Sequence, residues 1–281
     1  IPLGWFTVPA GFIPAFVLKK QVLHVYFIIN LDEIVKLPAV YRRYKKYRWL
    51  KDLTINKKEK LTLMSWMEES KMTMRERIRE GKLFTDECEG LPEERMSAKI
   101  RMWKFNHLMP DETEKRSACI NEIFGKETDA WIEPPFYFCY GTHITVGDGT
   151  YINMNCNFID DGIIQIGKNV LFGPAVTIAT VGHPVNPELR EYMYADPVVI
   201  GDNCWLGANV VVCPGVTIGR NSVIAAGSVV IHDIPENTVA VGNPCRVIRK
   251  IGEKDMKYYY RDRMIDTEDL KEEKLLRKGA E

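Results

Sequence analysis

The sequence predicts a mainly β protein, a solenoid of short parallel strands that is preceded by helices. An apolar residue recurs at every sixth position from 200 to 230, and an earlier run with the same period extends from 146 to 178 with a two-residue slip. The recurring residues are Val146, Ile152, Phe158, Ile166, Phe172, Ile178, Ile200, Leu206, Val212, Ile218, Ile224 and Val230. A period of six matches neither a helix nor a two-residue alternation, and it is typical of a repeat protein.

Each six-residue unit is predicted to form one short strand and a tight corner, and three units complete a triangular coil. The recurring residue then points inward, so that stacked coils bury one continuous core. The residue after it is usually small, as at Gly201, Gly207 and Gly219, which lets the corner turn and the next coil approach. The fourth residue after it is also compact.

Helices are predicted before the solenoid, between residues 64 and 126. Three segments have capping signals: 73–80 before Gly81, 93–107 after Pro92, and 111–124 before Gly125. The second is predicted to pack through an apolar face of Met96, Ile100, Met102, Trp103 and Phe105. The predicted domains are a segment 1–60, a helical cap 64–128, the solenoid 129–250 and a charged tail 251–281 that we expect to be helical.

Composition excludes few classes of protein. Lys plus Arg and Asp plus Glu both number 38, which gives no indication of a nucleic-acid partner. The seven cysteines form no C-x-x-C pair and show no zinc-ligand spacing, and no cleavable signal peptide is evident. Reduced thiols and a cytoplasmic location are therefore expected.

The first 60 residues differ from the rest. Residues 21–31 are apolar but too short to span a bilayer, and residues 41–51 interleave aromatic and basic side chains. That pattern suits either a cytoplasmic membrane interface or a solvated basic helix. Any membrane contact of this protein is expected to depend on this segment being retained.

The string I-N-L-D-E-I-V-K-L-P-A-V-Y-R-R-Y-K-K-Y-R-W-L-K-D-L-T resembles the end of multidrug and toxic compound extrusion transporters. The resemblance covers about residues 1–57, only a last helix and tail, and so implies no transport. Since the chain begins with Ile, a truncated transporter reading into the next gene or a misjoined gene model is expected, with a membrane anchor as the alternative. Met72 is a plausible natural start.

The six-residue period breaks between residues 180 and 197, around the sequence T-V-G-H-P-V. Solenoids tolerate insertions at their corners, and such loops often form the binding face. His183 lies at the root of this insertion. A histidine there is a natural general base, because an imidazole titrates near neutrality.

Five motifs between residues 81 and 249 resemble those of the galactoside O-acetyltransferases and their maltose-specific relatives. They are G-K-L-F-T-D-E-C-E-G-L-P-E-E-R (81–95), W-I-E-P-P-F-Y-F-C-Y-G (131–141), Y-I-N-M-N-C-N-F-I-D-D (151–161), G-H-P-V (182–185) and G-N-P-C-R-V-I-R (242–249). The resemblance, over about residues 72–260, implies a left-handed parallel β-helix and acetyl-CoA as co-substrate. It also implies no metal, and a homotrimer with its sites between subunits.

The resemblance also assigns the acceptor side of the site. His183 is implied to deprotonate a sugar hydroxyl. Asn153, as a second catalytic residue, and Tyr151 are implied to lie near that hydroxyl, although Asn153 also suits a solenoid corner. Asp86 and Asp161 are implied to accept hydrogen bonds from sugar hydroxyls. Two further acceptor positions are Met193 and Cys139, and Cys139 departs from the serine that is common there. Asp160 is expected to be structural.

On the acetyl-CoA side the resemblance implies seven positions: Trp205, Ala208, Ala226, Ile231, His232, Arg246 and Arg249. The backbone N–H of Ala208 is the implied oxyanion donor, and the two arginines are implied to meet the nucleotide phosphates. Relatives often have Thr-Lys at Ile231-His232, so one permanent cation is missing here.

Alternatives remain open at this point. A zinc-dependent γ-type carbonic anhydrase shares the solenoid, but it needs three converging histidines, and the three in the repeat region lack the expected spacing. A purely structural solenoid would not need the whole set of site residues. Within the enzyme class, the acceptor could be a galactoside, maltose, glucose or an antibiotic hydroxyl.

Overall fold

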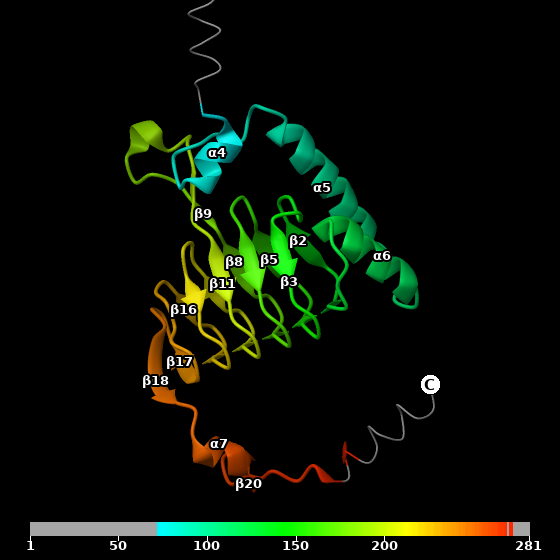
Figure 1. The fold of residues 1–281 in the computed structure, drawn as a ribbon, viewed down its shortest axis with the longest axis vertical. Helices are drawn as coiled ribbons and strands as arrows, with labels where there is room; N and C mark the ends of the chain where they lie inside the picture. The colour runs from blue at the N-terminus through cyan, green and yellow to red at the C-terminus, as the bar shows by residue number, and fades with distance from the viewer. Residues whose placement is uncertain (1–71, 269, 272–281) are drawn as a thin grey trace, which may run out of the picture. The chain divides into compact units, whose positions relative to one another are not determined.

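The computed structural model describes residues 72–268, 270 and 271 (Figure 1). The predictions for the segment 1–60, including the transporter-like stretch, therefore lie outside the described residues. Three helices come first, and a solenoid of short strands follows, as predicted.

The strands of the solenoid form three parallel sheets, and each coil passes through them in the same order. Sheet 1 contains β1 (Trp131–Ile132), β4 (Tyr151–Ile152), β7 (Leu171–Phe172), β12 (Trp205–Leu206), β15 (Val223–Ile224), β17 (Thr238–Val241) and the antiparallel β18 (Arg246–Lys250). Sheet 2 contains β2 (Phe136–Phe138), β5 (Cys156–Ile159), β8 (Thr177–Ala179), β13 (Val211–Val212) and β16 (Val229–Val230). Sheet 3 contains β3 (Ile144–Val146), β6 (Ile164–Ile166), β11 (Val198–Ile200) and β14 (Thr217–Ile218).

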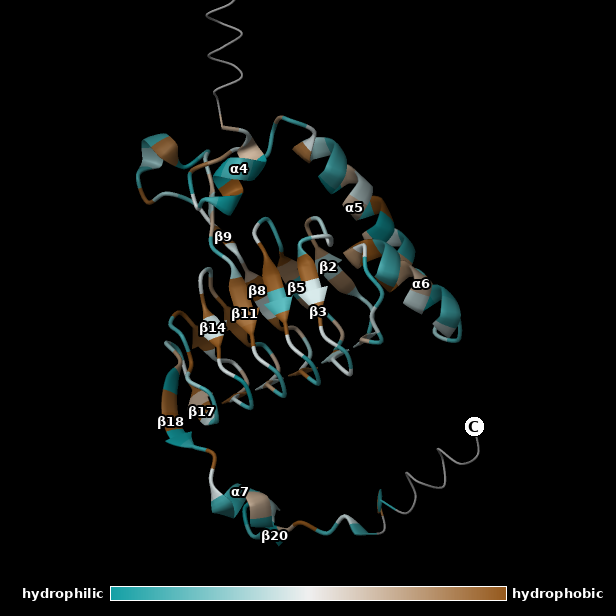
Figure 2. Ribbon diagram, in the orientation of Figure 1, coloured by the Kyte–Doolittle hydropathy of each residue, from teal (hydrophilic) through white to brown (hydrophobic). Residues whose placement is uncertain are grey.

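The recurring apolar residues all point into this solenoid, so the predicted core is confirmed. All twelve are buried, and in Figure 2 hydrophobic colour follows the strands. The rings of Phe136 and Phe158 lie 5.1 Å apart between centroids, and those of Phe158 and Phe172 lie 5.5 Å apart. Neighbouring coils therefore contact each other along the whole axis.

The small residue after each core position has a narrower role than predicted. A Cβ on Gly207 would lie 2.6 Å from the backbone nitrogen of Ala226, so the glycine permits close approach of the next coil. The turn itself is made two residues later, where Asn209 has a φ of 57°. Asparagine tolerates this left-handed conformation better than most residues.

The cap consists of α4 (Met74–Arg79), α5 (Leu91–Asn106) and α6 (Thr113–Phe124). Thr73 caps α4 through a reciprocal pair of hydrogen bonds with Glu76, and Gly125 ends α6 in the left-handed conformation. The starts of α5 and α6 differ by two residues from the predicted starts, 93 and 111.

The predicted packing face of α5 is largely wrong. Met96, Ile100 and Trp103 are 58, 63 and 64% exposed. Phe105 of the predicted face is buried and Met102 packs against the core. The buried residues of α5 are spaced by seven, which is two helical turns: Leu91, Ala98 and Phe105. The helix contained two apolar stripes, and the sequence pattern did not distinguish between them.

The charged tail is not uniformly helical. After α7 (Glu253–Lys257), the chain forms a short antiparallel hairpin of β19 (Tyr258–Tyr260) and β20 (Arg263–Met264). Between residues 72 and 271, leaving out 269, no helix has the length and apolar character needed to cross a membrane.

Candidate active site

The predicted site residues gather on two different edges of the triangular solenoid. The corners between sheets 2 and 3 form what we call the arm edge, residues 139–143, 160–163 and 180–197. The corners between sheets 1 and 2 form the groove edge, residues 153–155, 173–175, 207–209 and 225–227. Stacking of the coils brings together corners that are far apart in sequence.

The insertion at 180–197 is an arm with a two-stranded root, β9 (Val181–Gly182) and the antiparallel β10 (Tyr194–Ala195). Gly182 lets the side chain of Tyr194 pack against the root, because a Cβ there would lie 2.5 Å from the Tyr194 hydroxyl. The arm contacts the cap through Phe84 and Met193, whose backbones exchange two hydrogen bonds of 2.9 Å. This bridge places the arm beside the chain segment that carries Asp86.

His183 follows directly after β9, and its ring is fixed from one side. Its Nδ1 lies 2.9 Å from the carbonyl oxygen of Arg190 and 3.0 Å from that of Tyr192. Carbonyl oxygens only accept hydrogen bonds, so Nδ1 carries the hydrogen and Nε2 presents a lone pair. A histidine held in this tautomer can take a proton from a hydroxyl group.

Asp160 and Asp161 lie at the arm edge of the second coil and have different surroundings. Asp160 accepts hydrogen bonds from the backbone N–H groups of Cys139, Tyr140 and Gly141, at 2.7, 2.9 and 2.7 Å. It is therefore a structural anchor for the corner above, in line with the expectation. Asp161 is only 4% exposed.

A positive charge from the cap reaches this edge. Arg95, on α5, forms an ion pair with Asp86, and its guanidinium also lowers the pKa of Asp161. The sequence analysis did not select Arg95, although it lies in the 81–95 motif. Only the fold shows that α5 brings it into contact with Asp86.

Burial dominates the titration of this cluster. It raises the pKa of Asp161, and the neighbouring charge of Asp160 raises it further, whereas Cys139, Arg95 and His143 lower it. Burial also raises the pKa of Cys139 to about 12, so its thiol stays protonated at neutral pH. Tyr140 is a second residue that sequence reasoning missed: its buried hydroxyl has no partner among the described residues.

The groove edge is apolar. A groove of ≈ 450 Å³ is lined by Gly173, Pro174, Trp205, Gly207, Ala208, Val223, Ile224, Ala225 and Ala226. Trp205 points outward from β12 and is 54% exposed. Within the described part of the chain, the Ala208 N–H donates to no other residue, while its carbonyl accepts from Gly227. Three predicted acetyl-CoA residues thus line one groove.

Tyr151 and Asn153 belong to this side of the molecule as well. Tyr151 pairs in register with Trp131 and Leu171 on sheet 1. Asn153 follows at the groove edge, where its side-chain oxygen accepts the N–H of Met154 at 2.8 Å. Both residues therefore lie across sheet 2 from Asp161.

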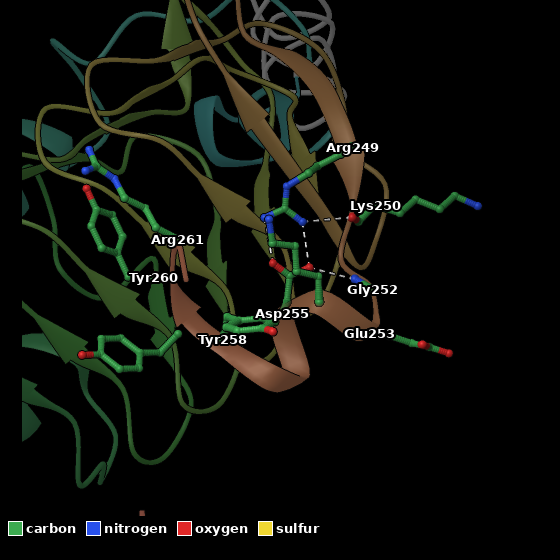
Figure 3. A pocket seen from close by; sticks show the side chains of 10 residues that line it. Arg249, Lys250, Gly252, Glu253, Asp255, Tyr258, Tyr260 and Arg261 are labelled. Atoms are coloured by element: carbon green, nitrogen blue, oxygen red, sulfur yellow. Dashed lines mark hydrogen bonds and ion pairs between the residues drawn. The ribbon is translucent and has the colours of Figure 1, made fainter. Parts of the chain in front are cut away.

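The remaining predicted acetyl-CoA residues lie apart from the groove. Ile231 and His232 are exposed directly after β16, and Arg246 and Arg249 lie on β18. Arg249 forms two hydrogen bonds with Asp255, at 2.7 and 2.8 Å, beside a cavity of ≈ 550 Å³ (Figure 3). This pairing lowers the pKa of Asp255 to about 2.

No group of three or more His, Cys, Asp or Glu side chains that could hold a metal ion occurs in the described residues. The arrangement is a fixed histidine and a carboxylate cluster on one edge, with an apolar groove on the other. With the six-residue repeat, it defines the class of hexapeptide-repeat transferases.

Comparison with known proteins is consistent with this class. Residues 197–232 match the family model "Bacterial transferase hexapeptide (six repeats)", and residues 77–127 match "Maltose acetyltransferase hexapeptide capping motif". The galactoside O-acetyltransferase of Escherichia coli K12 is 53% identical over 199 residues, which are 70% of this chain and 98% of that protein. The Lactococcus lactis galactoside O-acetyltransferase is 40% identical over 71% of this chain and 99% of its own length.

Solved structures show the same relationship. A galactoside acetyltransferase in complex with coenzyme A is 53% identical, with a TM-score of 0.68, and covers 70% of this chain and all of its own. A maltose O-acetyltransferase from Clostridium difficile 630 is 45% identical, with a TM-score of 0.63 and coverage of 65% and 99%. This chain belongs to the galactoside and maltose O-acetyltransferase family of hexapeptide-repeat proteins.

Proposed function

We propose that this protein transfers an acetyl group from acetyl-CoA to a hydroxyl of a galactoside or similar sugar, with His183 as general base. The observation that carries the proposal is the ring of His183, whose Nδ1 is engaged by two carbonyl oxygens while Nε2 is available. The family supports the reaction type. The relatives' names support a sugar acceptor and coenzyme A.

The proposed reaction is a direct transfer. Nε2 of His183 takes the proton of the sugar hydroxyl, and the hydroxyl oxygen attacks the thioester carbonyl. The negative charge on the carbonyl oxygen is stabilised by the N–H of Ala208. The C–S bond then breaks, the acetyl ester remains on the sugar, and the thiolate of coenzyme A receives the proton from the imidazolium.

Both edges must contribute to one site, and one chain cannot bring them together. A side of the solenoid spans about six residues, which at about 3.3 Å per residue puts the edges on the order of 20 Å apart. Direct attack needs the reacting atoms at about 3–3.5 Å. We therefore propose that the arm edge of one copy meets the groove edge of the next, in a closed homotrimer.

The outward side chains of sheet 1 support this assembly. They form an apolar column in register: Trp131, Tyr151, Leu171, Trp205 and Val223. The corresponding column on sheet 3 is Thr145, Gln165, Val199 and Thr217, which is mostly polar. An exposed apolar column on one face of three is typical of an interface.

The roles of the other predicted residues are part of the same proposal. Asp86, Cys139, Asp161 and Met193 would contact the sugar, with Tyr151 and Asn153 supplied by the neighbouring copy. Trp205, Ala208 and Ala226 would line the pantetheine, with Ile231, His232, Arg246 and Arg249 toward the nucleotide. The cytoplasmic location, the left-handed coil, the domain boundaries and the transporter-like origin of residues 1–57 remain proposals from the sequence.

An acceptor panel with acetyl-CoA and a thiol reagent tests the function. We expect transfer to galactosides, and absence of transfer to every sugar hydroxyl would overturn the proposal. Maltose is the second candidate, because the cap matches a motif named for maltose acetyltransferases. Glucose and an antibiotic hydroxyl complete the panel, and light scattering of the active protein tests the trimer.

A further inference from the structure

We infer that Arg95 is a positioning residue of the acceptor site, which holds Asp86 and Asp161 as a pair of charged hydrogen-bond acceptors for neighbouring hydroxyls of the sugar. The inference rests on the proposed function, since it concerns how that site recognises its acceptor. It adds a residue of the cap whose effect is exerted through two carboxylates.

The first support is geometric. Asp86 lies in the segment between α4 and α5, and Asp161 lies at a corner of the solenoid. Arg95 forms an ion pair with Asp86, and its charge also reaches Asp161. One guanidinium therefore serves carboxylates from two separate parts of the chain.

The second support is electrostatic. Asp161 is 4% exposed, and burial favours the neutral form of a carboxyl group. The groups that face Asp161 are Asp160, which raises its pKa, and Cys139, His143 and Arg95, which lower it. Tyr140 adds a buried phenol whose own pKa is raised by burial and by Asp161.

Among these neighbours, Arg95 carries a charge that pH cannot remove in the working range, because a guanidinium does not titrate there. An ionised carboxylate only accepts hydrogen bonds, so two of them suit a pair of hydroxyl donors. A protonated Asp161 would lose part of that acceptor capacity. Arg95 thus keeps the site in the form that recognises a vicinal diol.

The test compares three variants of the full chain. Arg95→Met removes the charge and keeps much of the length, Arg95→Lys keeps the charge, and Lys99→Met is the matched control. Lys99 is an exposed cation on the same helix and makes neither of these contacts. The measurements are KM for a galactoside and for acetyl-CoA, and the pH dependence of kcat/KM for the galactoside.

In Arg95→Met we expect KM for the galactoside to rise about 10-fold or more at pH 7, with KM for acetyl-CoA within a few-fold. The acid limb of kcat/KM should move to higher pH, because loss of the Arg95 charge raises the pKa of Asp161. Arg95→Lys should restore part of both effects, and Lys99→Met should behave like the unmodified chain.

Carbon-13 NMR of the labelled Asp161 carboxyl gives a readout that needs no activity. A higher Asp161 pKa in Arg95→Met is expected even if no sugar is ever acetylated, which separates this inference from the proposed function. An unchanged acid limb and an unchanged Asp161 pKa would overturn it. Equal losses in Arg95→Met and Arg95→Lys, with KM for acetyl-CoA also raised, would assign Arg95 a purely structural role.

Discussion

The arm edge and the groove edge belong to the same solenoid but differ in chemical character. The arm edge is polar: Asp161 is buried, the charge of Arg95 on the cap lowers its pKa, and His183 is fixed by two carbonyl oxygens. The groove edge is open and apolar, and the exposed side of Trp205 forms its wall. This difference in polarity indicates that one chain can build the arm edge of the proposed site alone, whereas the groove edge needs a covering surface.

Polar recognition depends on direction, so its groups must be fixed before the ligand binds. The arm edge has these supports within one chain, through the Phe84–Met193 bridge and the three N–H groups that hold Asp160. Apolar contact depends on buried area, at roughly 25 cal/mol per Å². A half-exposed tryptophan gains that area only when another surface covers it, as the neighbouring copy would in the proposed trimer.

Replacing His183 should have the largest effect, because it removes the proposed base from the arm edge and leaves the groove intact. We expect His183→Ala to lower kcat by about 10²–10⁴, with KM for acetyl-CoA within a few-fold. Steady-state kinetics measure both values. A variant that retained more than about a tenth of the activity would move the base elsewhere, with His143 and His232 tested next.

Asp161→Asn should affect only the acceptor, because the amide keeps the shape and loses the charge. We expect kcat/KM for a galactoside to fall about 10–100-fold, the cost of a hydrogen bond to a charged group, with no change in KM for acetyl-CoA. The unmodified enzyme should also lose kcat/KM as pH falls, because the raised pKa of Asp161 brings protonation into a milder acid range. Retention of that acid limb in Asp161→Asn would assign the titration to another group.

Trp205→Ala should affect the groove edge instead. We expect KM for acetyl-CoA to rise roughly 10-fold and the trimer to dissociate at a higher protein concentration, because apolar area is lost. Tyr137→Ala is the matched control, since Tyr137 is an outward aromatic residue on sheet 2 with 42% exposure. Equal effects of the two substitutions on KM and assembly would contradict a specific role of the groove edge.

Cys139→Ser should have a small effect, and it would sharpen the comparison within the arm edge. Both side chains are neutral donors at neutral pH, since the pKa of Cys139 is raised to about 12. We expect kcat to change less than about 5-fold, because one neutral hydrogen-bonding group replaces another. The rate of acetylation of galactosides should rise relative to that of maltose. An acceptor panel at fixed acetyl-CoA gives the ratio, and an unchanged ratio would remove Cys139 from acceptor selection.

Removing residues 1–71 should have the smallest effect. Each predicted site residue, and each residue of both edges, lies after position 71. We expect the chain from Met72 to keep the full activity and the same melting temperature. Loss of either would show that the first segment contributes to the folded enzyme.

The period of six was sufficient to predict inward residues from Val146 to Val230, although it missed those of the first strands, such as Ile132 and Phe138. Side chains in a strand alternate between its two faces. A repeat of six residues therefore places an equivalent position on the inner face of every strand of the solenoid. The three helices of the cap were also predictable in position to within two residues, because Gly81, Pro92 and Gly125 are local signals at helix ends. The family resemblance supplied the site residues one by one.

What the repeat could not determine was which corners become neighbours in space. Cys139, Asp161 and His183 share the arm edge, and Trp205 and Ala208 line the groove, because the stacked coils align segments that are far apart in sequence. The packing stripe of α5 and the placement of Arg95 also depended on how the cap lies on the solenoid. Whether a side chain of a solenoid strand points inward or outward depends on the local repeat, so the sequence determined it. Contacts between distant corners depend on coil closure, and only the tertiary structure decided them.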